Sequence, residues 1–157
     1  MSKATVTTFP KYEAPKPKPM SQSFAKTCVK TPVELAVLAD ILCRPRFADT
    51  DGEAYVIDKY LKVLPGARID DFGNIIVDLR GEDASNRTMF SCHTDTVHKK
   101  SAPNTPYKLA SRGQMLSVKG GGVLGADCGT GIWIMLNLIE AGVPGLYVFH
   151  REEEIGG

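Results

Sequence analysis

The chain has 157 residues, of which 43% are hydrophobic and 24% charged, and its net charge at pH 7 is +1. This length suits one domain with a core of its own, and the composition is that of a globular protein. The balanced charge gives no attraction to nucleic acid or to an anionic membrane. No apolar run reaches 18 residues, and no signal-peptide pattern follows Met1. We therefore expect a cytoplasmic protein that binds neither nucleic acid nor membrane.

The first 30 residues differ from the rest of the chain. They carry six Lys, one Glu and four Pro, so this segment has a charge of +5 and the remainder −4. Such a composition buries too little apolar surface to offset the entropy of ordering. The sequence predicts a disordered Pro- and Lys-rich tail over residues 1–30 and one folded domain over residues 31–157. The four cysteines lack CxxC spacing, so no disulfide framework is expected.

Helices and strands are expected to alternate along the folded part. Capping patterns at Thr31–Glu34 and Thr50–Glu53 each precede an apolar stripe with helical spacing, and a third helix, apolar on nearly every side, is expected over 132–139. Short runs rich in β-branched and aromatic residues predict strands over 67–71, 75–79, 88–93 and 146–150, and a hairpin over 107–118. This order predicts an α/β fold of three layers, with a mixed, mostly parallel sheet and helices on both faces.

Candidate functional residues follow the predicted strands. The strand over 88–93 ends in His93, and Asp95 stands two residues later, where both side chains would share one face. A His whose second ring nitrogen is held by an acid is a common metal ligand. Further carboxylates come from Asp127, at the end of a Gly-rich segment, and from the glutamates 152–154 after the last strand. Because such groups gather at one sheet edge in open α/β folds, the sequence predicts a cation site there.

Taken together, these stretches resemble the co-catalytic di-zinc exopeptidases, a superfamily of aminopeptidases, peptidase T-like tripeptidases, Xaa-His dipeptidases and related amidohydrolases. The resemblance covers about residues 31–157. It rests on four motifs in order: D-F-G-N at 71–74, H-T-D-T-V at 93–97, G-A-D-C-G-T-G at 125–131 and E-E-I-G at 153–156. It implies a partial zinc-peptidase catalytic domain, because the family takes a further acidic ligand and a late His beyond the last residue of this chain. A C-terminal half encoded separately would supply them.

The resemblance also implies the activity and the role of each residue. The activity would be hydrolysis of a peptide or amide bond in a small substrate, with two Zn²⁺ in the complete site. The implied metal ligands are His93, Asp127 and Glu154, with Asp127 bridging the two ions. Asp95 would hold the His93 ring, and Glu153 would be the general base that takes a proton from the attacking water.

Several assignments within this scheme stay open. If the register of the three glutamates shifted by one, Glu152 would be the base and Glu153 the ligand. Cys128 stands where many members of the superfamily have Asp or Asn, and its thiol could bind metal, although a small buried residue is the preferred interpretation. The peptide bond before it is often cis in that superfamily. His98 or His150 could replace a ligand.

Two other functions remain as alternatives. Gly120–Gly125 fits G-x-G-x-x-G, and its position before a helix is typical of a dinucleotide-binding, Rossmann-type oxidoreductase domain. Against this, Asp127 at the helix start would repel a pyrophosphate, and His93 and Asp95 would have no role. The other alternative is an inactive, truncated module that binds a metal or a partner and hydrolyses nothing.

Overall fold

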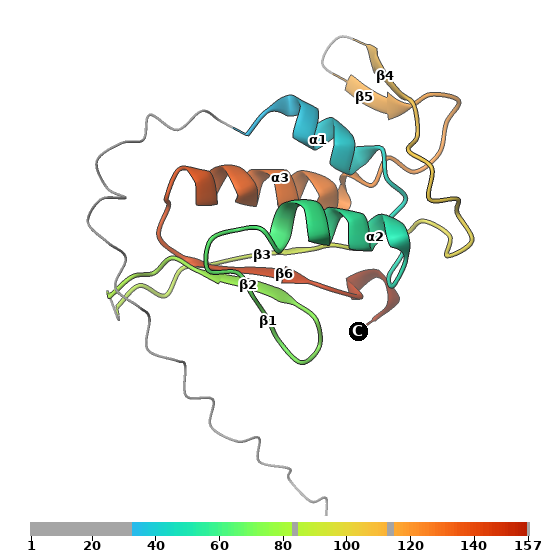
Figure 1. The fold of residues 1–157 in the computed structure, drawn as a ribbon. Helices are drawn as coiled ribbons and strands as arrows, with labels where there is room; N and C mark the ends of the chain where they lie inside the picture. Colours follow the sequence, from blue (N-terminus) through green and yellow to red (C-terminus); the bar gives the residue numbers. More distant parts are fainter. Residues whose placement is uncertain (1–32, 83–84, 113–114, 157) are drawn as a thin grey trace, which may run out of the picture.

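A computed structural model describes residues 33–82, 85–112 and 115–156 (Figure 1). The tail predicted over 1–30, and the residues Thr31 and Pro32 of the first capping pattern, lie outside the described residues. The elements in chain order are α1 (Leu35–Leu42), α2 (Asp51–Val56), the π-helix η2 (Ile57–Leu61), β1 (Arg68–Ile69), β2 (Ile75–Asp78), β3 (Met89–His93), β4 (Leu109–Arg112), β5 (Met115–Val118), α3 (Ala126–Glu140), β6 (Leu146–His150) and the 3-10 helix η3 (Glu153–Ile155).

The main sheet has four strands in the order β1-β2-β6-β3. The α/β class and the mixed sheet are confirmed. Within the described part, however, the sheet is not mostly parallel, because only β3 and β6 pair in parallel while β1–β2 and β2–β6 pair antiparallel. The physical reason lies in the connections. A short turn joins β1 to β2 and permits only antiparallel pairing, whereas the long connection through α3 returns β6 alongside β3 in the same direction.

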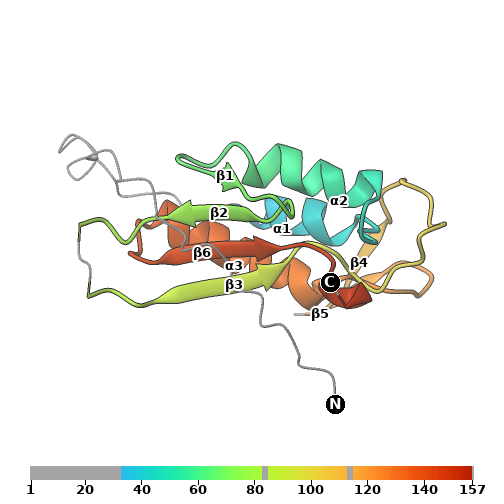
Figure 2. The same cartoon turned by 90° about the horizontal axis from the view of Figure 1, so that it is seen from below.

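The helices α1, α2 and α3 all lie on one face of this sheet (Figures 1 and 2). Side chains of alternate residues on the strands face them and are buried: Ile75, Val77, Tyr147 and Phe149 have no exposed surface. The intervening residues point to the opposite face, where Met89 is 59% exposed. Helices on both faces were expected, but in the described part of the chain only one face is covered.

Helix α3 forms the centre of the core. Its buried residues recur at helical spacing: Ile132, Met135, Leu136 and Ile139. Each such side chain stabilises the fold by about 1.5–3 kcal/mol when fully buried. The sequence predicted a helix buried on nearly every side. That prediction was wrong in one respect, because Ile134 on the outer side is 48% exposed.

The two predicted capping boxes do not form as expected. Helix α1 begins at Leu35, so Glu34 precedes the helix instead of occupying its third position, and it makes no side-chain cap. Thr50 is the N-cap of α2, but its hydroxyl donates to the carbonyl of Phe47. The Glu53 carboxylate accepts the amide of Asp49, one residue before the cap. In α2 a Cβ on Gly52 would come within 1.9 Å of the Pro45 carbonyl oxygen, so only glycine fits there.

The predicted hairpin is present as β4 and β5, which form a separate two-stranded antiparallel sheet. The glycines 120–122 follow β5 and therefore do not leave a strand of the main sheet. A Rossmann unit requires the glycine segment to join a parallel strand to its helix, so the dinucleotide-binding alternative is wrong. None of the helices in the described ranges combines the length and hydrophobicity that crossing a membrane would require.

Candidate metal centre

The parallel pairing of β3 with β6 brings the candidate residues together. His93 and His150 are partners in register at the carboxyl ends of the two strands. The segment after β6, with Glu153 and Glu154, therefore lies beside the segment after β3, with Asp95. Residues 58 or more positions apart in sequence become neighbours by this single pairing.

Asp95 is fully buried and holds two parts of the site at once. Its Oδ1 lies 3.3 Å from Nδ1 of His93, and its backbone carbonyl oxygen lies 3.1 Å from the same nitrogen. Its two carboxylate oxygens also accept the backbone N–H groups of Glu153, at 3.2 Å, and Glu154, at 3.0 Å. One carboxylate thus orients the imidazole and fixes the start of η3.

Asp127 faces the other nitrogen of the same ring. Gly125 adopts a left-handed conformation with φ +66°, and Asp127 and Cys128 have non-helical backbone angles, so the regular helix begins after them. The Asp127–Cys128 peptide bond is cis. This backbone path carries Asp127 Oδ1 to 3.1 Å from His93 Nε2, with the carboxylate side chain 91% exposed. The imidazole therefore lies between two carboxylates.

The charges around His93 favour a cation. Burial lowers the pKa of His93, but the hydrogen bond to Asp127 and the nearby Cys128, Asp95 and Glu153 raise it by more, so that the net shift is upward. Burial, together with Glu153, Asp127 and Asp95, raises the pKa of Glu154. Crowded carboxylates of this kind repel one another unless a positive charge lies among them.

Two groups of possible metal-binding atoms share His93. One consists of His93, Asp127 and Cys128, and the other of His93, Glu153 and Glu154; within each group the atoms lie within 4.8 Å of one another. Glu153 Oε2 is 4.0 Å from His93 Nε2. The structure therefore brings together all five residues predicted for the site, and Glu152 is in neither group.

The two other histidines have different partners. His98 is buried, accepts a hydrogen bond from Thr96 at Nδ1 and donates one from Nε2 to the Val123 carbonyl at 3.1 Å. Burial lowers its pKa. His150 Nε2 bonds to the hydroxyl of Ser91. Neither belongs to the two groups of metal-binding atoms, so these groups give no support to either histidine as a replacement ligand.

The two cysteines beside the site are coupled. The pKa of the Cys128 thiol falls to about 6, because the Cys92 thiol donates a hydrogen bond to its thiolate, while the pKa of Cys92 rises for the same reason. Cys43, Cys92 and Cys128 are all free thiols.

No pattern in the sequence indicated the buried Arg46, which has no exposed surface. Its guanidinium donates to three backbone carbonyls, those of Ile41 at 2.5 Å, Thr94 at 3.0 Å and Gly125 at 2.8 Å. Burial lowers its pKa to about 10. Because Thr94 and Gly125 stand next to the two loops of the site, Arg46 fixes the separation of His93 and Asp127. The only signal in the sequence was its position directly after Pro45.

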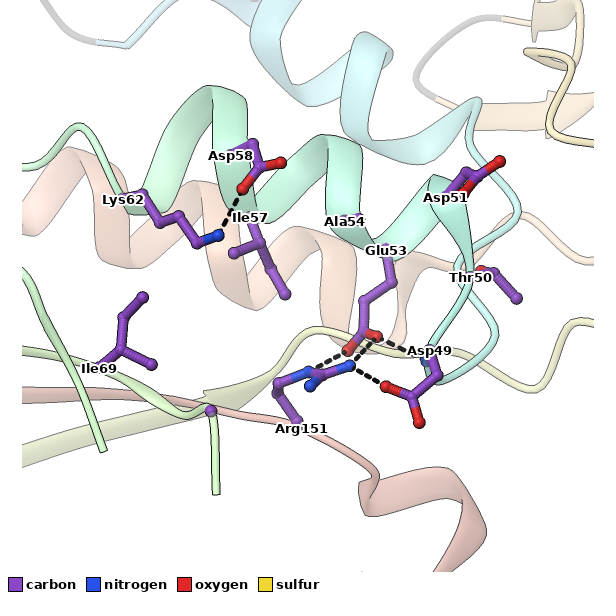
Figure 3. A pocket seen from close by; sticks show the side chains of 11 residues that line it. Asp49, Thr50, Asp51, Glu53, Ala54, Ile57, Asp58, Lys62, Ile69 and Arg151 are labelled. Carbon is purple, nitrogen blue, oxygen red and sulfur yellow. Dashed lines mark hydrogen bonds and ion pairs between the residues drawn. The ribbon is translucent and has the colours of Figure 1, made fainter. Parts of the chain in front are cut away.

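A second missed group joins α2 to the segment after β6. Arg151 bonds to Glu53 and to Asp49, and Glu53, which is buried, also accepts a hydrogen bond from the Thr94 hydroxyl at 2.6 Å. Figure 3 shows Glu53, Asp49 and Arg151 pointing toward one another beside a pocket of about 320 Å³. This pocket lies beside the ion pairs and is not lined by His93.

The D-F-G-N turn supports the same segment. Asp70 accepts the amides of Phe72 and Asn74, and the Asn74 side-chain oxygen accepts the amide of Arg151 at 3.0 Å. A second pocket, of about 390 Å³, is lined by Phe72, Asn74, His150, Arg151 and Glu153. The four motifs therefore meet at one end of the sheet.

Solved structures of three peptidases share this fold, which confirms the predicted α/β class with a mixed sheet. The chain matches a tripeptidase from Staphylococcus aureus (TM-score 0.61, 18% identity, 78% of this chain and 36% of the other), an aminoacylhistidine dipeptidase from Vibrio alginolyticus (0.57, 17%, 86% and 31%) and the aminopeptidase PepT from Bacillus cereus (0.56, 20%, 78% and 36%). The chain thus spans about a third of their length. Comparison with protein-family models and with curated proteins gives no match.

Proposed function

We propose that this chain contributes the metal-binding part of an exopeptidase, which hydrolyses a peptide or amide bond near the end of a short substrate with the help of two Zn²⁺. The observation that supports this most is the His93 imidazole held between Asp95, at Nδ1, and Asp127, at Nε2. Glu153 Oε2 lies 4.0 Å from that Nε2. The three structures with this fold are named as a tripeptidase, a dipeptidase and an aminopeptidase.

The donor atoms suit zinc. Zinc takes imidazole nitrogen, carboxylate oxygen and thiolate sulfur. Because Nδ1 of His93 faces Asp95, Nε2 is the nitrogen left for an ion, as in many His sites supported by a carboxylate. Asp127, at 3.1 Å from Nε2 and exposed, has both oxygens available to bridge two ions. Glu154 would ligate the second ion.

The remaining residues orient the site and move the proton. A bound zinc pair would polarise the scissile carbonyl and lower the pKa of a water molecule. Asp95 keeps the imidazole in one orientation and holds the amides of Glu153 and Glu154. Glu153, 61% exposed and facing the 390 Å³ pocket, would take the proton from water and return it to the leaving amine. We favour Glu153 over Glu152 as the base because Glu152 belongs to neither group of donor atoms.

The proposal assigns this chain one part of the site. The chain spans about a third of the length of the structures that it matches, so a segment outside the 157 residues would supply the remaining acidic ligand and a His, together with the residues that recognise the substrate terminus. The peptide would lie over Glu153 in the pocket that Phe72 and Asn74 also line.

The test begins with metal content. We expect mass spectrometry of the purified full chain to find bound zinc, and His93→Ala to lose at least one equivalent, whereas His150→Gln, which changes a histidine outside the donor groups, should not. Zinc content unchanged by His93→Ala would refute the proposal.

Hydrolysis is assayed with dipeptides and tripeptides, with and without a candidate C-terminal half. Glu153→Gln should retain zinc and abolish hydrolysis, while Glu152→Gln should retain both. If Glu153→Gln remains active, the base is another group. Zinc binding without any hydrolysis would instead support the alternative of a non-catalytic metal- or partner-binding module.

A further inference from the structure

We propose that the Cys128 thiolate is itself a metal ligand, together with His93 and Asp127, and that it makes this centre selective for thiophilic divalent cations such as Zn²⁺ and Co²⁺ over Mg²⁺ and Mn²⁺. The inference rests on the proposed function, because it concerns one of the two ions of the same site.

The geometry allows three donors to one ion. The Cys128 sulfur, a His93 ring nitrogen and an Asp127 oxygen lie within 4.8 Å of one another. Zinc binds nitrogen at about 2.0–2.1 Å and sulfur at about 2.3 Å, so its ligand atoms stand roughly 3.5 Å apart in a tetrahedron. Rotation of the exposed Asp127 side chain and a small shift of the thiol would close this difference.

The backbone directs the thiol toward β3. Cys128 has φ −103° and ψ 31°, so it departs from the path of α3 at its first turn. Gly131, one turn later, leaves the room that the thiol needs: a Cβ there would lie 2.3 Å from the Cys128 sulfur and 3.2 Å from Cys92 Cβ. The thiol therefore occupies the space between α3 and the end of β3, where His93 begins the site.

The donor set decides which metals bind. A site built from carboxylates and one imidazole accepts Mg²⁺ and Mn²⁺, whereas a thiolate strongly favours softer cations. A catalytic zinc usually has three protein ligands and an open position, and His93, Asp127 and Cys128 would provide that number from the described residues. If the thiol only packed against Cys92, metal binding would not respond to its removal.

The experiment is a titration of the metal-free full chain with Co²⁺ under reducing, oxygen-free conditions. A thiolate ligand gives a near-ultraviolet sulfur-to-cobalt charge-transfer band, in addition to the visible bands of bound cobalt. We expect both in the wild type. Cys128→Ser should lose the near-ultraviolet band, keep the visible bands and bind Zn²⁺ at least about tenfold more weakly. Cys43→Ser, a matched change at a free thiol outside the donor groups, should alter neither.

The outcomes separate this inference from the proposed function. If cobalt binds without a near-ultraviolet band, or if Cys128→Ser leaves that band in place, Cys128 is not a ligand. The proposed function then still stands if His93→Ala abolishes metal binding. If neither Co²⁺ nor Zn²⁺ binds the wild type, both proposals are overturned. Equal affinity for Mn²⁺ and Zn²⁺ would overturn the selectivity.

Discussion

Arg151 and Glu53, which are 98 residues apart in the chain, form a nearly buried ion pair, with Arg151 Nη2 2.9 Å from Glu53 Oε2. The Glu53 side chain is 1% exposed and the Arg151 side chain 21% exposed. The hydrogen bonds that Arg151 donates to the carboxylates of Glu53 and Asp49 raise its pKa, although burial opposes them. Because Arg151 stands two residues before Glu153, this pair anchors to α2 the segment that carries the candidate base.

Glu53→Gln should destabilise the fold by about 1–3 kcal/mol, because it removes the buried carboxylate that faces Arg151 and leaves the guanidinium with only the exposed Asp49 as counter-charge. Urea unfolding followed by circular dichroism measures this loss. The control is Asp58→Asn, which breaks the pair with Lys62 at 2.7 Å, where both side chains are about half exposed. Exposed pairs contribute less than about 1 kcal/mol, so equal losses in the two variants would contradict the anchoring role of Glu53.

Arg46→Lys should cost about 2–4 kcal/mol, because an ammonium cannot reach the carbonyls of Ile41, Thr94 and Gly125 together, and each buried carbonyl left without a donor costs about 1–3 kcal/mol. Arg80→Lys, at an exposed pair with Asp78, is the matched control and should cost under about 1 kcal/mol. Chemical denaturation of both variants provides the comparison. An Arg46 variant as stable as the Arg80 variant would show that the three carbonyls find other donors.

Asp95→Asn should loosen the segment after β6, because an amide side chain has one acceptor oxygen where Asp95 now accepts two backbone N–H groups. Loss of one hydrogen bond of about 1 kcal/mol should speed hydrogen exchange at Glu153 or Glu154 about fivefold. If the site holds zinc, affinity should also fall about 10–100-fold. Asp71→Asn, in the adjacent turn, is the control for exchange. Unchanged protection of both amides would show that other contacts hold the segment.

Asp40 should make stability depend on pH in the acidic range. Burial raises its pKa, but hydrogen bonds from Lys59, Tyr60 and Tyr55 outweigh this and lower it to about 2. A depressed pKa means that the folded state favours the carboxylate, so the stabilisation is complete above the unfolded value near 4 and is lost as pH falls from about 4 to 2. We expect about 1–2 kcal/mol, reduced by solvent screening.

The measurement compares wild type with Asp40→Asn by urea unfolding at several pH values. The difference in unfolding free energy should be largest at neutral pH and vanish toward pH 2. Asp51→Asn, at an exposed position in the first turn of α2, corrects for general acid effects. A difference that stays constant from pH 7 to 2 would exclude ionisation of Asp40 as its source.

The sequence predicted those parts of the fold that local patterns encode. A short run of β-branched and aromatic residues predicted β6 with its observed bounds, and the four motifs predicted the residues that meet around His93. It did not predict Arg46 or the Glu53–Arg151 pair, because a buried charge and its distant partner leave no periodicity. Glu53 instead fitted a local capping pattern, and tertiary pairing prevailed over it. The strand directions were also wrong in part, since pairing of β2 with β6 depends on contacts between segments about 70 residues apart.

Asp95 couples two parts of the site through a single carboxylate. One carboxylate contacts both the imidazole of His93 and the amides at the start of η3. Motion of the ring and fraying of η3 therefore depend on the same hydrogen-bond acceptor. The free energy by which ordering of the His93 ring stabilises η3 equals the free energy by which ordering of η3 stabilises the ring, because thermodynamic coupling is reciprocal. The order of η3 should therefore report on whether His93 has bound an ion.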